Sequence, residues 1–574
     1  MKFHTQGSVN QVKDRVKGSL LWVGFIVFFV TTCLSALEAR SYTPPIGIPD
    51  PSWGSIHPID SLAPSWPSGW PGSQVIGYYY IDNTHPSSTD TGNTYGYPNK
   101  PRKSIPTAYA AGSCVEIRGG PYVGDQLTIV ANGTPDKPVW IRGSSSGAKP
   151  TIRYEVIING SYVILENLFF DTSEKTLSFR YKSSSVDHAC IRNSEFAGPG
   201  TNIGNNAVIY VAGTSSVKTS NIVIYNNHVH DFGDDDSASE NDYHGVLPGE
   251  YSEYVWVLSN HIHNMGGDSI QVGQATYSAD QRPNYVYIGG NTFHDDRENA
   301  VDIKRANHVI VSQNTCYGYE PTGSSAGEVI IIHDGPDNVW ILYNKIHSGS
   351  YGIQTTQSTN TYFIGNLVYN IHHPSGTAWD PNSGYSYGAA IHFRGASTGG
   401  AIANTLYDYD TGIQLTQGTA AGYDIKNNIF AGRAEPLGMD IRVGDSSVAS
   451  GSNLDYCLFY YGGGSARIYW NASAVNVATF KSRYGKCLNC PGEADPLFGN
   501  PAGGDFHLQA SSPAKDKGTT HPAYTTFFNQ YGVDIRKDTE GRLRPQGAAW
   551  DIGAYEFELA PLAPKNVRVK EYSK

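Results

Sequence analysis

Short stretches of alternating apolar and polar residues recur along the middle of the chain, with no helical periodicity between them. A period of two places successive side chains on opposite faces of a β-strand. One set of such stretches ends at an asparagine, and a second set follows ten to twenty residues later. Examples of the first set are residues 254–260 (YVWVLSN) and 338–344 (NVWILYN), and examples of the second are 268–273 (DSIQVG) and 329–335 (VIIIHDG). We therefore predict an all-β chain in which each repeat carries two short strands.

The asparagines that end the first stretches form an internal repeat, each followed two places later by an apolar residue. Successive spacings run from 22 to 38 residues. Two strands in a unit of this length favour a parallel β-solenoid, because a propeller blade needs four strands in about 40 residues. We predict a parallel β-helix of about ten coils with irregular caps, in which the amides stack as a ladder. The repeat asparagines are Asn167, Asn193, Asn227, Asn260, Asn291, Asn314, Asn344, Asn366, Asn404 and Asn427.

Composition changes along the chain and divides it into five predicted segments. Basic residues precede an apolar run at 20–30, which is too short to span a membrane comfortably and indicates a signal peptide over residues 1–39. Proline-rich residues 40–75 follow, then the β-helix over 76–454, a C-terminal cap over 455–560 and a tail over 561–574. We expect a secreted protein, extracellular or periplasmic, that is monomeric and has no membrane span.

Net charge and cysteine content narrow the possible partners. The formal net charge is −11 with no basic stripe, so nucleic acid is not an expected partner. Cys114, Cys190 and Cys316 lie in apolar stretches and are expected in the core. A disulfide among Cys457, Cys487 and Cys490 suits an oxidising compartment, whereas a zinc site there has no identifiable fourth ligand.

Histidines recur three places after several repeat asparagines. His230, His263, His294 and His347 hold positions that other repeats fill with Tyr317, Tyr369, Tyr407 and Phe430. Since histidine alternates there with aromatic residues, we interpret the column as a stacking position and not as a metal cluster. The acidic loop at 231–245 is read as a solvated turn, with a cation site or a groove wall as the alternative.

Aligning the second strands of successive coils gives two outward columns. Neighbouring coils stand about 4.8 Å apart, so Lys304 and His333 become neighbours and Arg394 lies two rungs beyond His333. Adjacent cations with acids around them suit a carboxylated ligand. The columns are Gln271, Asp302, Ile331, Gln354, His392, Gln414, Arg442 and Gly273, Lys304, His333, Thr356, Arg394, Thr416, Gly444.

Residues 298–314 (ENAVDIKRANHVIVSQN) resemble a segment of the calcium-dependent pectate lyases, and residues 265–335 also resemble the chondroitinase-B and alginate lyase family. The resemblance implies a right-handed coil, calcium ligation by Glu298 and Asp302, and a catalytic base at Lys304. His333 stands where that second family has an arginine, and the arginine signature of pectate lyases is missing. Residues 455–560 resemble a terminal segment of exported bacterial β-helix proteins.

These features predict a lyase that cleaves an acidic, uronate-containing polysaccharide by calcium-assisted β-elimination. Lys304 is expected to abstract the proton, His333 to neutralise the carboxylate or protonate the leaving oxygen, and Arg394 to supply a further cation. Asp268 is a candidate third Ca²⁺ ligand. An ion pair with Asp302 would instead raise the pKa of Lys304 and oppose its role as base. Expected substrate-binding residues are His392, Gln271, Gln354 and Asp334.

Two other functions remain open from the sequence. One is a non-catalytic β-helix protein that binds glycans. The other is a glycoside hydrolase, which needs two carboxylates flanking a bond; Asp302 with Asp295, Asp296 or Asp334 could supply such a pair. The sequence does not identify the uronic acid polymer.

Overall fold

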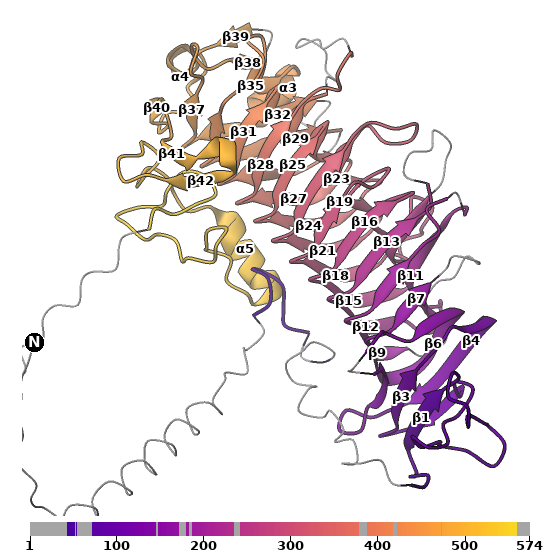
Figure 1. Cartoon of the computed structure of the whole chain (residues 1–574). Helices are drawn as coiled ribbons and strands as arrows, with labels where there is room; N and C mark the ends of the chain where they lie inside the picture. The colour runs from indigo at the N-terminus through magenta and orange to yellow at the C-terminus, as the bar shows by residue number, and fades with distance from the viewer. Residues whose placement is uncertain are drawn as a thin grey trace, which may run out of the picture. The chain divides into compact units, whose positions relative to one another are not determined.

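The computed structural model describes residues 43–51, 53, 72–144, 147–171, 179–182, 186–201, 203–234, 242–377, 387–395, 397–416, 422–471 and 473–558. Within these residues the chain winds into a right-handed parallel β-helix, in which each strand from β7 to β35 pairs in parallel with the strand three places later (Figure 1). The predicted signal peptide and the tail after residue 558 lie outside the described residues. Export and a monomeric state stay predictions. No helix that the structure describes has the length and apolar character to cross a membrane.

Each regular coil carries three strands, one more than the two predicted. The unrecognised strand begins directly after the repeat asparagine and is short. The first ladder ends at the asparagine corner and contains β1 (Tyr78–Asp82), β3 (Cys114–Arg118), β5 (Val139–Gly143), β6 (Thr151–Glu166), β9 (Asp187–Arg192), β12 (Thr219–Tyr225), β15 (Ser252–Leu258), β18 (Asn284–Gly289), β21 (Asn307–Ser312), β24 (Asp337–Leu342), β27 (Thr359–Ile364), β30 (Gly399–Ile402), β33 (Tyr423–Lys426) and β36 (Asn453–Asp455).

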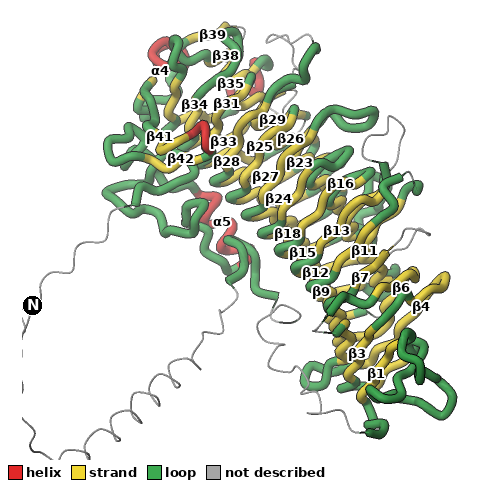
Figure 2. Tube along the Cα trace, viewed as in Figure 1, coloured by secondary structure: helices red, strands yellow, loops and turns green. Residues whose placement is uncertain are grey.

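The second ladder follows the asparagine corner, and the third ladder completes the coil (Figure 2). The second contains β7 (Phe169–Asp171), β10 (Glu195–Ala197), β13 (His228–Phe232), β16 (His261–Met265), β19 (Thr292–His294), β22 (Thr315–Tyr319), β25 (Lys345–Gly349), β28 (Leu367–Ile371), β31 (Thr405–Tyr409), β34 (Ile429–Ala431), β37 (Leu458–Tyr460) and β40 (Gly492–Glu493). The third contains β2 (Ala108–Ala110), β4 (Tyr122–Asn132), β8 (Phe179–Lys182), β11 (Asn206–Ala212), β14 (Tyr243–Pro248), β17 (Ile270–Val272), β20 (Val301–Lys304), β23 (Glu328–His333), β26 (Tyr351–Thr356), β29 (Ala389–Arg394), β32 (Thr411–Thr416), β35 (Met439–Val443) and β38 (Ile468–Trp470).

The corner between the first and second ladders explains the asparagine repeat. The Oδ1 atom of Asn314 accepts both the backbone N–H of Asn291 at 2.9 Å and its side-chain amide at 2.9 Å. The same pattern connects buried asparagines from Asn227 to Asn404 and ends at Asn428. The residue before each of these asparagines has a left-handed backbone or is a glycine, as at Gln313 (φ 54). This conformation turns the chain, and the buried amide then satisfies the peptide groups of the corner.

Three of the predicted ladder positions are corrected by the structure. Asn167, Asn193 and Asn427 are the left-handed residues one place before the ladder, with φ of 56, 53 and 58. The ladder position itself is filled by Ser194 and Asn428 in the latter two coils. Because of this one-residue difference, Phe430 points into the core, where it is fully buried and stacks on Phe459.

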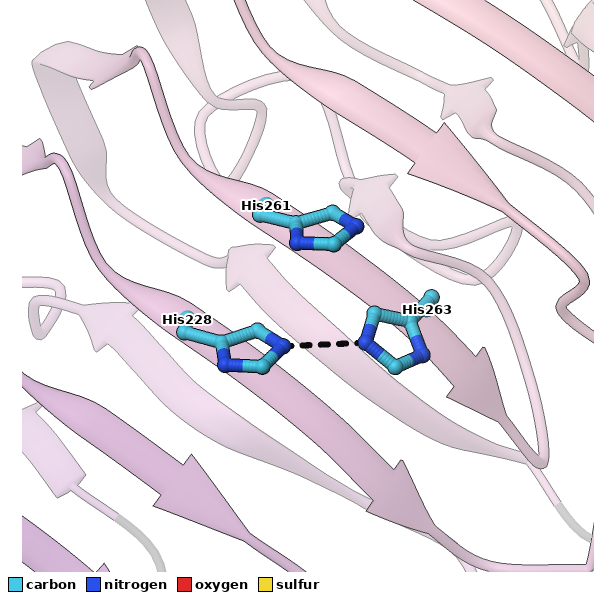
Figure 3. Close-up of side chains that lie close together, drawn as sticks. All are labelled: His228, His261 and His263. Atoms are coloured by element: carbon cyan, nitrogen blue, oxygen red, sulfur yellow. Dashed lines mark hydrogen bonds between the residues drawn. The ribbon is translucent and has the colours of Figure 1, made fainter.

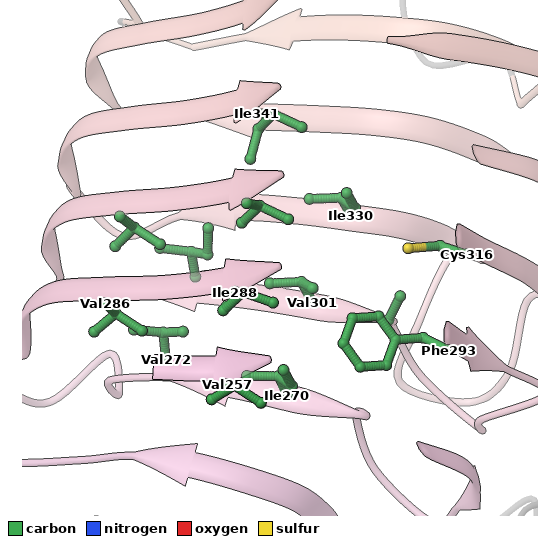
Figure 4. Close-up of a cluster of buried hydrophobic side chains, with 14 of the residues drawn as sticks. Val257, Ile270, Val272, Val286, Ile288, Phe293, Val301, Cys316, Ile330 and Ile341 are labelled. Atoms are coloured by element: carbon green, nitrogen blue, oxygen red, sulfur yellow. The ribbon is translucent and has the colours of Figure 1, made fainter. Parts of the chain in front are cut away.

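Aliphatic side chains fill the interior in stacked columns (Figure 4). Val257 and Ile288 face inward from successive first-ladder strands, and Ile270, Val301 and Ile330 do so from the third ladder, all fully buried. Each contributes about 1.5–3 kcal/mol through burial of its apolar surface. The first ladder contains fourteen strands in the described chain, more than the ten coils inferred from asparagines, because β1, β3 and β5 precede the repeat and β36 follows it.

The carboxyl-terminal region first extends the coil and then runs back along it. Strands β36, β37, β38 and β40 continue the parallel ladders, with α3 (Ser446–Gly451) and α4 (Val477–Tyr484) between strands, and β39 (Ser473–Val475) adds an antiparallel pair. Strands β41 (Phe498–Asn500) and β42 (Asp505–Leu508) form a hairpin, with the 3₁₀ turn η2 (Pro501–Gly503) between them. Helix α5 (Pro522–Tyr531) then packs on the first ladder, where Phe527 contacts Trp340 edge to face at 5.0 Å. Residues 45–49 also bind this face.

The cysteines occupy two kinds of site. Cys487 and Cys490 form a disulfide, which resolves the three alternatives, and Cys457 stays free and buried. Cys114, Cys190 and Cys316 are buried thiols in the core, as predicted.

Candidate functional site

The two predicted outward columns are present on the third ladder in the predicted register. Lys304 pairs with His333 on adjacent strands, and Thr356 pairs with Arg394. Arg394 therefore lies two rungs beyond His333, as expected. The first column runs in the order Gln271, Asp302, Ile331, Gln354, His392, Gln414, Arg442.

Asp302 forms the centre of a charged network on this face. Its Oδ2 lies 2.8 Å from Nζ of Lys304, and its Oδ1 lies 3.0 Å from Nε2 of His333. Lys304 also donates to Oε1 of Gln271 at 2.8 Å, and Nδ1 of His333 lies 3.0 Å from Oδ2 of Asp334. Lys304 and His333 keep 21% and 24% of their side-chain surface exposed, so both reach solvent.

These contacts set the protonation states of the network. Burial opposes the charge of Lys304, but Asp302 and other nearby acids outweigh it and raise the pKa of the lysine. Burial likewise opposes the charge of His333, while the hydrogen bond to Asp302 raises its pKa. Burial works against ionisation of Asp302, yet His333 and Lys304 lower its pKa overall. A lysine held protonated is a poor base at neutral pH. The geometry therefore fits Lys304 as a fixed cation and gives no support to its expected role as base.

The three expected calcium ligands do not form one cluster. Among the described residues, two groups bring three or more possible ligand atoms within 4.8 Å of one another, and both are rich in histidine. Glu298, Asp302 and Asp268 do not form such a group. Both oxygens of Asp302 are already used by Lys304 and His333. As a set these residues do not fit a preformed Ca²⁺ site, and calcium dependence stays a prediction.

Asp268 and Glu298 are two neighbouring carboxyl groups whose ionisation is disfavoured. Oδ2 of Asp268 is buried and faces Nδ1 of His244 at 3.1 Å, in a geometry that makes no hydrogen bond. Burial and the nearby Asp302 raise the pKa of Asp268 well above its usual range. Burial and the charge of Asp268 raise the pKa of Glu298 to about 8. Protons, or a cation, are therefore needed to neutralise this pair.

Two expected substrate-binding residues are enclosed by the protein. His392 is 1% exposed, and its ring nitrogens contact Oε1 of Gln354 and Oγ1 of Thr416, each at 2.8 Å. Gln354 in turn donates to Glu328 at 2.8 Å. Burial and the cation Arg394 lower the pKa of His392 to about 3, which keeps the ring neutral. These contacts use both ring nitrogens inside the protein, so His392 is structural here.

A cavity of about 480 Å³ opens beside Lys304, over strands of four successive coils. Lys304 and Gln271 are the predicted site residues that line it. The sequence interpretation named none of the others as site residues, although Asp242 and His244 lie within the acidic loop at 231–245, for which a groove wall was one alternative. The lining residues are Asn205, Asn206, Tyr210, Asp242, His244, Leu247, Gln271, Gln274, Ala275, Thr276 and Lys304.

His244 and Asp268 form a buried pair at this cavity. Nδ1 of His244 lies 3.1 Å from Oδ2 of Asp268 and also faces the backbone N–H of Asp268 at 3.1 Å. Gly267 permits this approach, because a Cβ there would stand 2.7 Å from Nδ1. Burial lowers the pKa of His244, so the ring is neutral at neutral pH. The cavity thus combines a protonated amine with a neutral imidazole.

The histidine column of the second ladder stacks as predicted. Rings of His263 and His294 lie 4.7 Å apart and nearly parallel, and His294 continues onto Tyr317 at 4.9 Å. His347 stacks between Tyr317 and Tyr369 in the same way.

No protein-family model matches the chain, and no curated protein matches it. Solved structures do show similarity. The chain is similar to the pectate lyase Pel9A (12% identity, 84% of this chain and 96% of that one, TM-score 0.39) and to the family 6 alginate lyase AlyGC (14%, 79% and 57%, TM-score 0.44). It is also similar to a GH136 lacto-N-biosidase from Eubacterium ramulus (15%, 64% and 66%, TM-score 0.37). Values this low carry no argument about activity, and the fold rests on the strand ladders themselves.

Proposed function

We propose that this protein is a polysaccharide lyase that cleaves a uronate-containing chain by β-elimination in the cavity beside Lys304. The observation that carries the proposal is that Lys304 and His244 line one cavity. β-Elimination needs a cation to neutralise the uronate carboxylate and a group that takes the neighbouring proton. The two side chains supply these two properties within reach of the same ligand.

Lys304 is assigned to the carboxylate of the substrate. The ion pair with Asp302 at 2.8 Å keeps the amine charged and fixes its position. A fixed cation stabilises the negative charge that develops when the proton next to the carboxylate leaves. His333, on the next rung and also held by Asp302, adds positive charge along the same face.

His244 is assigned to the proton transfer. To act as a base, the ring must present a free lone pair at Nε2, which requires its proton on Nδ1, facing Oδ2 of Asp268 at 3.1 Å. Ionised Asp268 favours this tautomer, whereas the backbone N–H of Asp268 favours the opposite one. Because burial raises the pKa of Asp268, the productive form increases as the pH rises. We therefore expect lyase activity to increase with rising pH.

The test is a panel of polyuronides incubated with the full chain, with and without calcium and chelator. A lyase produces an unsaturated uronate end, which is followed by its ultraviolet absorbance. Lys304→Met and His244→Gln are each expected to lower the rate at least a hundredfold, in line with losing one charge-stabilising or proton-transferring group. Lys218→Met is the matched control, because Lys218 lies directly before the first-ladder strand β12 and pairs there with Glu253 at the surface.

Other outcomes would refute the proposal. New reducing ends without the absorbance change would indicate a hydrolase. Retention on an immobilised acidic glycan without any product would indicate a binding protein. Full activity in both Lys304→Met and His244→Gln would show that the reaction takes place elsewhere on the coil.

A further inference from the structure

Five imidazoles gather on three successive strands of the second ladder, away from the cavity of the third ladder. His228 pairs with His261, and His230 pairs with His263, which pairs with His294. The result is two parallel columns of rings on β13, β16 and β19.

The nitrogens of the two columns converge. Nε2 of His228 lies 2.9 Å from Nε2 of His263, and one nitrogen of His261 lies within 4.8 Å of both (Figure 3). A second group shares His228 and adds Glu195 and His230. Ring nitrogens that face each other in this way can bind one metal ion together, because imidazole is the most common ligand for metals of the zinc class.

The two columns differ in how far their aromatic stacks run. The column of His230, His263 and His294 continues into tyrosines, so its rings belong to a long aromatic stack. In the other column the rings of His228 and His261 stack on each other at 4.9 Å. That column begins at Glu195 and continues into Thr292, Thr315 and Lys345, none of which is aromatic. Its two histidines also face the longer stack through ring nitrogens, His228 with His263 at 2.9 Å and His261 with His294 at 2.8 Å.

Nearby carboxylates orient two of the five rings, His230 and His294, which flank the group of His228, His261 and His263. Oδ2 of Asp231 lies 2.7 Å from Nδ1 of His230, and Oδ2 of Asp295 lies 2.7 Å from Nδ1 of His294. A carboxylate at Nδ1 holds the proton there and leaves the lone pair at Nε2, the arrangement common behind ligating histidines. Nε2 of His230 and Nδ1 of His263 are buried without a hydrogen-bond partner. Each neutral imidazole carries one proton for two nitrogens, and these two nitrogens stay unsatisfied within the described chain.

We propose that His228, His261 and His263 bind one divalent transition-metal ion of the zinc class, with a fourth position open to water. A bond length of 2.0–2.1 Å in tetrahedral geometry separates two ligand nitrogens by about 3.3 Å. The rings of His228 and His263 need to separate by only a few tenths of an ångström from their 2.9 Å distance. The ion would cross-link β13 and β16 on the outside of the coil.

The experiment measures Zn²⁺ binding to the full-length, tag-free chain after treatment with chelator, by isothermal titration calorimetry and by the visible spectrum of the Co²⁺ form. We expect one equivalent of Zn²⁺ and Co²⁺ bands typical of tetrahedral nitrogen ligation. His228→Gln and His263→Gln should each weaken binding at least tenfold, and the circular dichroism of the metal-free variants checks that they fold. His347→Gln is the matched control, because His347 stacks in the column of His230, His263 and His294 but lies outside the cluster.

Each contrary outcome identifies the error. No binding at micromolar Zn²⁺ by the folded wild-type chain would overturn the proposal. Unchanged affinity in both His228→Gln and His263→Gln would do the same. Loss of binding in His230→Gln together with full binding in His261→Gln would reject this ligand set in favour of the group that contains Glu195.

Discussion

Replacing one asparagine in the middle of the corner ladder tests how the coil is stabilised. In Asn314→Ala, two groups of Asn291 lose their acceptor, the backbone N–H and one N–H of the side-chain amide. The carbonyl of Ile288 and Oδ1 of Asn344 each lose one donor. Asn291 and Asn314 are each only 1% exposed, so water does not replace these contacts.

The magnitude follows from the two orphaned donors. A buried donor without a partner costs about 1–3 kcal/mol, so Asn314→Ala should reduce the free energy of unfolding by about 4 kcal/mol. Asn227→Ala provides an internal comparison, because Asn227 accepts only the backbone N–H of Ser194 from the preceding coil. With one orphaned donor in place of two, its cost should be about 2 kcal/mol.

The assay is equilibrium unfolding in urea, followed by both circular dichroism and tryptophan fluorescence to show that one transition is measured. Thr315→Ala is the control, because Thr315 faces outward next to the ladder, and it should change stability by less than about 1 kcal/mol. Equal losses in Asn314→Ala and Asn227→Ala, or a loss below about 1 kcal/mol in Asn314→Ala, would refute the assignment of stability to the paired donors.

Three further predictions concern buried groups away from the cavity. The folded chain holds the pKa of His392 at about 3, against 6.5 for a free ring, so the unfolded state binds the proton first as the pH falls. At pH 5 this lowers the free energy of unfolding of the wild type by about 2 kcal/mol. His392→Gln should lack this loss when urea titrations at pH 7 and pH 5 are compared. Arg544 and Glu556 form a fully buried pair at 3.1 Å, so Glu556→Ala should destabilise its segment by about 3–5 kcal/mol, measured by thermal unfolding. Phe527→Ala removes the contact with Trp340 and should expose α5 to limited proteolysis while the coil keeps its circular dichroism.

The coil was predictable because most of its corners repeat one residue type, a buried asparagine. A corner needs a left-handed residue and then a buried amide, and both leave a mark in the sequence, as in Gln313 and Asn314. The second-ladder strand was missed because it is short and follows the asparagine directly. The β-helix was predicted from residue 76, but the coils before residue 166 were not counted because their corners lack the asparagine.

The register of the site was predictable for a similar reason, whereas its chemistry was not. Alternation along each strand and the coil repeat place Lys304 beside His333 without any knowledge of the loops. The protonation of Lys304 depends on which oxygen of Asp302 it reaches, and that is a matter of side-chain geometry. His244 comes from an earlier coil, after a loop whose course no periodicity defines. The role proposed for His244 could be recognised only once the cavity was known.

A side chain on a parallel coil meets neighbours in fixed register on the adjacent rungs, so outward side chains can satisfy their hydrogen bonds with one another. His392 is an example, because both of its ring nitrogens contact side chains on the adjacent rungs. Sites for ligands are then expected where this mutual satisfaction fails. Among the places where it fails within the described chain are Oδ2 of Asp268 beside the cavity and the buried nitrogens of His230 and His263 on the neighbouring face. These two places on the coil carry the two proposals, since a buried polar atom without a protein partner costs free energy that a ligand can recover.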